Sequence, residues 1–362
     1  MDERKSMIEE IVKLELPVFI WGNGSLGDLS YRVLNENGVH VTGFVVDNEY
    51  IAEEGNANVW SKHDLEEKFE SYVIVKAILS KMAVDDEKIK QYFKNCIKVY
   101  SLVDTEGVAG IEKIDSKYYQ ENKIRFDQVR DALVDQFSKD SMDAFIRAEI
   151  EDNNSYIYPF VITPQYYFET DYWQFQSDEI LIDGGAFDGD SIRDFVERTD
   201  RQYEKIYACE PDADNMKALI KNIKMEEMHN VELIAKGLYS RTDILQFDSR
   251  GDMMSQIVDK NVEKGNKLAV DRIDNILNGT RASIIKMDIE GAEMEALKGA
   301  KETICNYHPL LFISAYHKRS DLFMIYEYIL SLYDKYKFFF RIHKPYAGDA
   351  VLYAIPEERM LK

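Results

Sequence analysis

A short apolar run, followed by a glycine-rich loop and an amphipathic helix, occurs twice in this chain of 362 residues. The first copy has the apolar run 17–21 and the loop 22–27, and the second has the run 179–183 and the loop 184–191. A glycine loop between a buried strand and a helix is typical of open α/β sheets, which bind ligands beyond the carboxyl ends of their strands. We therefore predict two α/β units in one chain.

The second copy continues as alternating apolar runs and helical patterns, which predict mostly parallel strands with helices between them. These strands are expected at residues 179–183, 205–210, 231–235, 283–288 and 309–316. Two further runs, 337–343 and 349–355, are separated by only five residues (KPYAG) and must pair as an antiparallel hairpin. Five parallel strands with a terminal antiparallel hairpin form the Rossmann-like sheet of class I methyltransferases, and this layout does not suit a dehydrogenase.

The first copy predicts a smaller Rossmann-like unit, with strands at 17–21, 39–48, 72–77 and 96–102. Between the two units, the segments 126–137 and 141–153 have apolar residues at three- and four-residue spacing, and Ser141 is a plausible N-cap. We interpret this region as a packed helical connector that braces the two units. The predicted division is 1–103, 104–175 and 176–362.

Composition excludes several classes of protein. The formal net charge is −21, and such an excess of negative charge repels nucleic-acid phosphates. No apolar run approaches the roughly 18 residues of a membrane span, and the charged start MDERKSMIEE lacks a signal-peptide core. Cys96, Cys209 and Cys305 are far apart, which argues against disulfides and zinc and favours the cytoplasm.

Acidic residues crowd the second glycine loop, where Asp183, Asp188 and Asp190 lie around the start of the helix. This charge would repel the diphosphate of a dinucleotide and attract the ammonium and sulfonium of S-adenosylmethionine. The loop therefore favours S-adenosylmethionine over NAD. An acidic glycine-rich turn without any ligand is the alternative.

The other strand ends extend this predicted cofactor site. Glu210 closes the second strand, where a carboxylate can accept from both ribose hydroxyls. The segment 236–238 follows the third strand and is expected to border the adenine. The predicted cofactor residues are Asp183, Gly184, Gly185, Ala186, Phe187, Asp188, Gly189, Ser191, Glu210, Pro211, Asp212, Lys236, Gly237, Leu238 and Asp288.

Three motifs together resemble the FkbM-type methyltransferases. They are DGGAFDGDS (183–191), Glu210-Pro211 and KMDIEGAE (286–293), while VDRIDNIL (270–277) is similar to a further family stretch but matches loosely at Arg272 and Ile273. The resemblance covers about residues 165 to 355. It implies S-adenosylmethionine-dependent O-methylation, usually of sugars or glycan-linked hydroxyls, with no established metal requirement.

Methyl transfer to a hydroxyl needs a base for the departing proton. His317 follows the fifth strand and His343 lies at the tip of the hairpin, both at the expected edge, and a neutral imidazole suits neutral pH. Either histidine could instead be an ordinary surface residue. Asp288 is the candidate for a structural or substrate-orienting carboxylate. No nearby residues have metal-ligand spacing, so no metal is expected.

The first unit carries the fingerprint Gly22-x-Gly24-x-x-Gly27 with Asp47 after the next strand. It could bind a nucleotide sugar, or it could serve only for docking or formation of a homo-oligomer. Residues 164–168 form either a lid over the cofactor or plain packing. The alternatives to a sugar-hydroxyl methyltransferase are a silent nucleotide-sugar or cofactor binding protein, and a nicotinamide oxidoreductase that works through the first unit.

Overall fold

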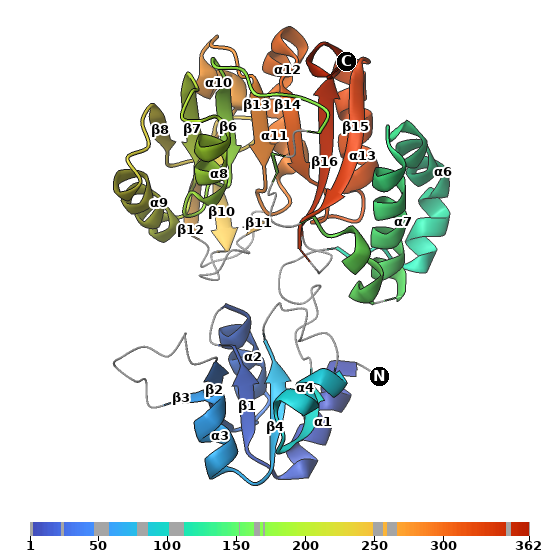
Figure 1. Cartoon of the computed structure of the whole chain (residues 1–362), viewed down its shortest axis with the longest axis vertical. Helices are drawn as coiled ribbons and strands as arrows, with labels where there is room; N and C mark the ends of the chain where they lie inside the picture. The colour runs from blue at the N-terminus through green and yellow to red at the C-terminus, as the bar shows by residue number, and fades with distance from the viewer. Residues whose placement is uncertain are drawn as a thin grey trace. The chain divides into compact units, whose positions relative to one another are not determined.

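The computed structural model describes residues 3–22, 25–46, 58–77, 86–100, 112–151, 153–162, 167–168, 171–248, 256–258, 266–344 and 349–361. The chain forms two compact units, Met1–Gly110 and Ile111–Lys362 (Figure 1). Each unit is built around its own sheet.

The sheet of the first unit is fully parallel, with the strand order β3-β2-β1-β4-β5. Its strands are β1 (Val18–Trp21), β2 (Val41–Val46), β3 (Val59–Ser61), β4 (Tyr72–Lys76) and β5 (Cys96–Tyr100). Its helices are α1 (Glu3–Leu14), α2 (Ser25–Glu36), α3 (Lys62–Lys68) and α4 (Asp86–Tyr92). This is the doubly wound, Rossmann-like order that the sequence predicts, with the three-residue edge strand β3 as an addition.

The central strand β1 is buried on both faces. Val18 and Ile20 belong to one apolar cluster, whereas Phe19 and Trp21 belong to another. This explains why residues 17–21 are continuously apolar rather than alternating. At the start of α2, a Cβ atom on Gly27 would lie 2.3 Å from the carbonyl oxygen of Gly22, so this glycine permits close helix–strand packing.

The second unit contains a seven-stranded sheet with the order β15-β16-β14-β13-β6-β7-β8. Its strands are β6 (Ile180–Gly184), β7 (Lys205–Cys209), β8 (Val231–Ile234), β13 (Ile284–Met287), β14 (Leu310–Ser314), β15 (Tyr336–Ile342) and β16 (Ala350–Pro356). The first five are parallel, and β16 pairs antiparallel with both β14 and β15. The predicted class I methyltransferase sheet is confirmed.

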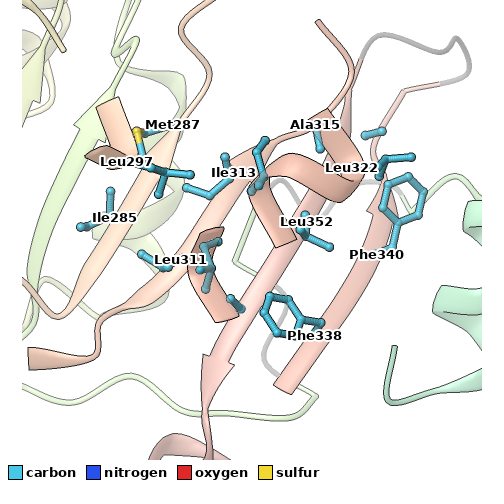
Figure 2. Close-up of a cluster of buried hydrophobic side chains, with 14 of the residues drawn as sticks. Ile285, Met287, Leu297, Leu311, Ile313, Ala315, Leu322, Phe338, Phe340 and Leu352 are labelled. Atoms are coloured by element: carbon cyan, nitrogen blue, oxygen red, sulfur yellow. The ribbon is translucent and has the colours of Figure 1, made fainter. Parts of the chain in front are cut away.

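Helices cover this sheet and bury its faces in two apolar clusters. They are α8 (Asp190–Arg198), α9 (Ala213–Met225), α10 (Ile273–Leu277), α11 (Glu293–Gly299), α12 (Lys301–Tyr307) and α13 (Asp321–Leu332). Figure 2 shows one cluster, where alternate residues of β13 to β16 pack with Leu297 of α11 and Leu322 of α13. Because both faces of the sheet are buried, the carboxyl ends of its strands are held in fixed positions.

The helical connector belongs to the second unit. It consists of α6 (Ser116–Ala132), α7 (Gln136–Glu151) and the 3-10 turns Asn154–Tyr156 and Tyr158–Phe160. Phe145 of α7 packs on Phe340 of β15, with ring centroids 5.6 Å apart. The backbone N–H of Val134 also donates to the carbonyl of Phe338, so the connector covers the edge strand β15.

The predicted N-cap at Ser141 is wrong. Ser141 lies inside α7, and its hydroxyl donates to the carbonyl of Phe137 one turn earlier. The helix begins instead at Gln136, where the carboxylate of Asp135 accepts from the backbone N–H of Ser138. Apolar periodicity is interrupted only briefly between α6 and α7, which is why the sequence pattern placed the break too late.

A small additional sheet lies between β8 and β13 in the sequence. Its strands are β9 (Gly237–Leu238), β10 (Asp243–Asp248), β11 (Gln256–Val258) and β12 (Asn266–Asp271), in the order β11-β10-β12-β9. A final 3-10 turn, Glu357–Arg359, follows β16. None of the helices in the described part of the chain has the length and apolar character that a membrane crossing needs.

Candidate active site

The glycine loop after β6 lies against the end of β13. Gly185 and Ala186 donate their backbone N–H groups to the carbonyl of Cys209, at distances of 3.0 and 3.1 Å. Gly185 has φ +72°, and a Cβ atom there would lie 1.9 Å from the backbone oxygen of Asp288. The close approach and the left-handed backbone both require glycine. The loop and the residues after β13 therefore form one continuous site.

The side chain of Asp183 stabilises this loop through contacts with Ser191 and Lys286. Its carboxylate is fully buried, accepts from the Ser191 hydroxyl at 2.5 Å, and lies 3.0 Å from the ammonium of Lys286. The Lys286 ammonium also donates to the carbonyl of Gly185 at 2.9 Å. Burial alone would lower the pKa of Lys286, but the carboxylates of Asp183 and Asp288 raise it overall. Lys286 thus offsets part of the acidic charge that the sequence places at this loop.

Glu210 ties the end of β7 to the same loop. Its carboxylate accepts from the backbone N–H of Phe187 at 2.9 Å and from that of Asp212 at 2.8 Å. Asp212 in turn caps α9 by accepting from two backbone N–H groups. The structure therefore brings together the loop, Glu210 and Asp212, as the sequence predicts for a cofactor site. Pro211 lies between the two acids in the chain.

The segment after β8 is divided between two environments. The ammonium of Lys236 donates to the Asp271 carboxylate at 2.7 Å. Leu238 is buried, and a Cβ atom on Gly184 would lie 2.7 Å from its methyl group. Leu238 therefore borders the loop, whereas the charged end of Lys236 is held by β12.

Beyond β13 and β14, three carboxylates surround one imidazole. His317 Nε2 lies 3.6 Å from Asp288 and 3.3 Å from Glu290, and His317 Nδ1 lies 3.1 Å from Glu293. We call Asp288, Glu290, Glu293 and His317 the carboxylate–histidine cluster. The side chains of His317 and Glu293 are 0% and 1% exposed, but those of Asp288 and Glu290 are 22% and 25% exposed. Asp288 and Glu290 are therefore the members of the cluster that a substrate can reach from solvent.

The cluster changes the protonation of its members. Burial alone would lower the pKa of His317, but Glu293 and Glu290 raise it well above its ordinary value. Burial, reinforced by Asp288 and Glu293, raises the pKa of Glu290 to about 7 in spite of His317. These carboxylates therefore favour the protonated imidazole, which argues against our expectation of a neutral histidine as the base.

Two tyrosines hold the outer carboxylate of the cluster. Asp288 accepts from the hydroxyls of Tyr167 and Tyr316, both at 3.0 Å. The ring of Tyr167 also lies 5.6 Å from that of His343, whose Nε2 is 2.7 Å from the hydroxyl of Tyr353. His343 is buried, and its ring lies next to Tyr167, which donates to Asp288 of the cluster.

Sequence reasoning missed several parts of this site. Lys286, Glu290 and Glu293 stand inside the motif 286–293, but the spacing gave them no separate roles. Tyr167 lies in a segment interpreted as packing or a lid, and its neighbours 163–166 lie outside the described residues. Asn23, Gly24 and Asp47 of the first fingerprint also lie outside them.

Three side chains of the cluster are close enough to hold a metal ion. They are the carboxylates of Asp288 and Glu293 and the imidazole of His317, whose ligand atoms all lie within 4.8 Å of one another.

The sheet order and strand-end residues define a methyltransferase of class I architecture. Residues 183–340 match the model of the methyltransferase FkbM domain. This region is therefore similar to the methyltransferase FkbM domain, as the motifs indicate.

Solved structures agree with the fold. The chain is similar to the methyltransferase FkbM from Methylobacillus flagellatus KT, with 23% identity over 96% of this chain and 93% of that one and a TM-score of 0.65. Weaker matches include an rRNA methylase from Streptococcus thermophilus, with 11% identity over 50% of this chain and 87% of that one and a TM-score of 0.33. No curated protein matches the chain.

Proposed function

We propose that the chain is an S-adenosylmethionine-dependent O-methyltransferase that acts on a hydroxyl of a sugar, nucleotide sugar or glycan precursor. The observation that carries this proposal is the contact between Gly185 and the backbone of Asp288. Through it, a loop suited to a cofactor and a set of acid–base groups share one edge of the sheet. Methyl transfer needs both elements side by side.

The proposed cofactor site uses the loop 184–191 and Glu210. The Glu210 carboxylate accepts two backbone N–H groups and also interacts with the Asn215 side chain, so one of its about four lone-pair sites remains to accept from a ribose hydroxyl. Asp188 and Asp190 add negative charge that attracts the sulfonium and ammonium of S-adenosylmethionine. Lys236 is held by Asp271, so of the segment 236–238 we assign only Leu238 to the cofactor side.

The proposed acceptor site is the exposed side of the carboxylate–histidine cluster. Glu290 follows β13 with φ +56° and has one of the two partly exposed carboxylates, so we assign it the proton of the acceptor hydroxyl. Asp288, fixed by two tyrosine hydroxyls, orients the acceptor. His317 and His343 are buried and act as positioning residues behind them.

The test incubates the full chain with S-adenosylmethionine and a panel of nucleotide sugars and glycans, followed by mass spectrometry for the gain of one methyl group. We expect a methylated product. Glu290→Gln should lower turnover about 100- to 10,000-fold, because a positioned base contributes that much. Its S-adenosylmethionine affinity, measured by calorimetry, should equal that of the parent.

Two outcomes would overturn parts of this proposal. A chain that binds S-adenosylmethionine but methylates no sugar acceptor would be a methyltransferase of another specificity or a silent binding protein. A folded chain that does not bind S-adenosylmethionine would contradict the cofactor assignment itself. NAD binding at the first unit, measured in the same way, would favour the oxidoreductase alternative.

A further inference from the structure

The inner part of the carboxylate–histidine cluster carries a feature that methyl transfer does not use. Glu293 and His317 are almost completely buried, next to the partly exposed Asp288. Their ligand atoms lie within 4.8 Å of one another. We propose that Asp288, Glu293 and His317 bind one divalent transition-metal cation.

The hydrogen bonding of these side chains supports the binding of a cation. Among the described residues, the Oε2 atom of Glu293 has no hydrogen-bond partner. Both ring nitrogens of His317 lie within ion-pair distance of carboxylates, but neither makes a hydrogen bond of acceptable geometry. Buried polar atoms without partners are costly, and a cation bound to Glu293 and to one ring nitrogen of the neutral imidazole would satisfy the Glu293 oxygen and that nitrogen.

The negative charge of the cluster also favours a bound cation. Three carboxylates, from Asp288, Glu290 and Glu293, face a single imidazole. The carboxylate of Asp321 is also nearly buried next to Glu293. A divalent cation would displace the imidazole proton, and the remaining carboxylates would balance the charge of the cation.

The donor atoms indicate the kind of metal. One imidazole with two carboxylates suits Mn²⁺, Fe²⁺ or Zn²⁺ better than Ca²⁺ or Mg²⁺, which prefer oxygen ligands alone. Metal–ligand bonds of about 2.0–2.2 Å require neighbouring ligands to approach one another slightly more closely than they do here. Small side-chain movements toward the ion are therefore sufficient.

The supporting contacts resemble those of a built metal site. The carboxylate of Asp288 is held by Tyr167 and Tyr316, and the Oε1 atom of Glu293 accepts from the backbone N–H of Ile289 at 2.9 Å. Outer contacts of this kind orient the ligands of a metal. A cation bound here would leave positions open on the side of Asp288, where it would polarise an acceptor hydroxyl.

The experiment titrates the full chain, first treated with a chelator, with Mn²⁺ alone and follows free Mn²⁺ by electron paramagnetic resonance. We expect one saturable site. Outer contacts change metal affinity about 10- to 100-fold, so removing a ligand by Glu293→Gln or His317→Gln should weaken Mn²⁺ binding more than about 100-fold. Glu295→Gln is the matched control, because it removes the same charge from α11 but its carboxylate pairs with Lys298 and Ser240.

The proposal is overturned if binding is not saturable, or if the cluster variants bind Mn²⁺ as the parent does. If those variants do not fold, the site is tested on the Mn²⁺ that is bound to the parent protein. Pulsed spectra should then show coupling to an imidazole nitrogen, and its absence contradicts the site. The same samples are titrated with S-adenosylmethionine, so loss of the metal site and loss of the proposed function are distinguished.

Discussion

The two units share a doubly wound strand order around a central strand, yet they bury very different side chains. Among the described residues of the first unit, the buried polar side chains apart from aromatic ones are those of Ser30 and Ser61. The second unit buries many ionisable groups: Glu149, Glu179, Asp183, Glu210, Asp271, Lys286, Glu293, His317, Asp321, Arg341, His343 and Asp349.

This difference shows that the residues that build a sheet are not the residues that can carry out chemistry at its edge. Apolar strands such as β1 and β6 are sufficient to build either sheet. A buried charge, in contrast, is costly unless it is paired, so a unit that keeps several of them at its strand ends is organised for binding or catalysis. The similarity of the two sheets therefore says little about a common function.

The largest expected effect is on the buried pair of the second unit. Lys286→Ala leaves the Asp183 carboxylate uncompensated in the core, which should lower the free energy of unfolding by about 3–5 kcal/mol. Urea denaturation followed by circular dichroism measures this. Lys205→Ala is the control, because the side chain of its partner Glu232 is almost half exposed. If the free energy of unfolding falls by the same small amount in both variants, buried and exposed ion pairs do not differ in the way that we expect.

A smaller effect is expected on cofactor affinity. Glu210→Ala should weaken S-adenosylmethionine binding by at least about 1 kcal/mol, because it removes a charged hydrogen-bond acceptor. Asp47→Ala changes the acid that follows the second strand of the other unit and should leave the affinity unchanged. Calorimetry on both variants checks this. A reversed result would place the cofactor in the first unit.

The exposed ion pair of the first unit should contribute least to stability. Lys98 and Glu10 form a close pair, but both side chains are almost half exposed and screened by solvent. Lys98→Ala should therefore leave the urea midpoint of the chain unchanged within error. A clear shift would show that the first unit also depends on charge.

Removal of the first unit should have no effect on cofactor binding. A fragment comprising residues 111–362 keeps α6 and α7, which pack on β15. It should bind S-adenosylmethionine as the full chain does, provided that circular dichroism shows it to be folded. A folded fragment that binds no cofactor would mean that the two units form the site together.

Most of the fold was predictable because it depends on patterns along the chain. The buried strands of both sheets are apolar runs, and the hairpin β15–β16 follows from its short connection. The strands β3, β9 and β11 are very short, and half of the residues in β10 and β12 are polar, so neither length nor periodicity revealed them.

The candidate site also has a part that could be predicted from the sequence and a part that could not. The loop 184–191 and Glu210 could be predicted, because each directly follows a buried strand and backbone geometry alone places it at the sheet edge. The sequence by itself thus determined the class of sheet and the position of its cofactor edge. Only the tertiary structure brought His317 between Glu290 and Glu293 and set Lys286 against Asp183. Burial and neighbouring charge decide the protonation of these groups, and both depend on how separate strands and helices pack.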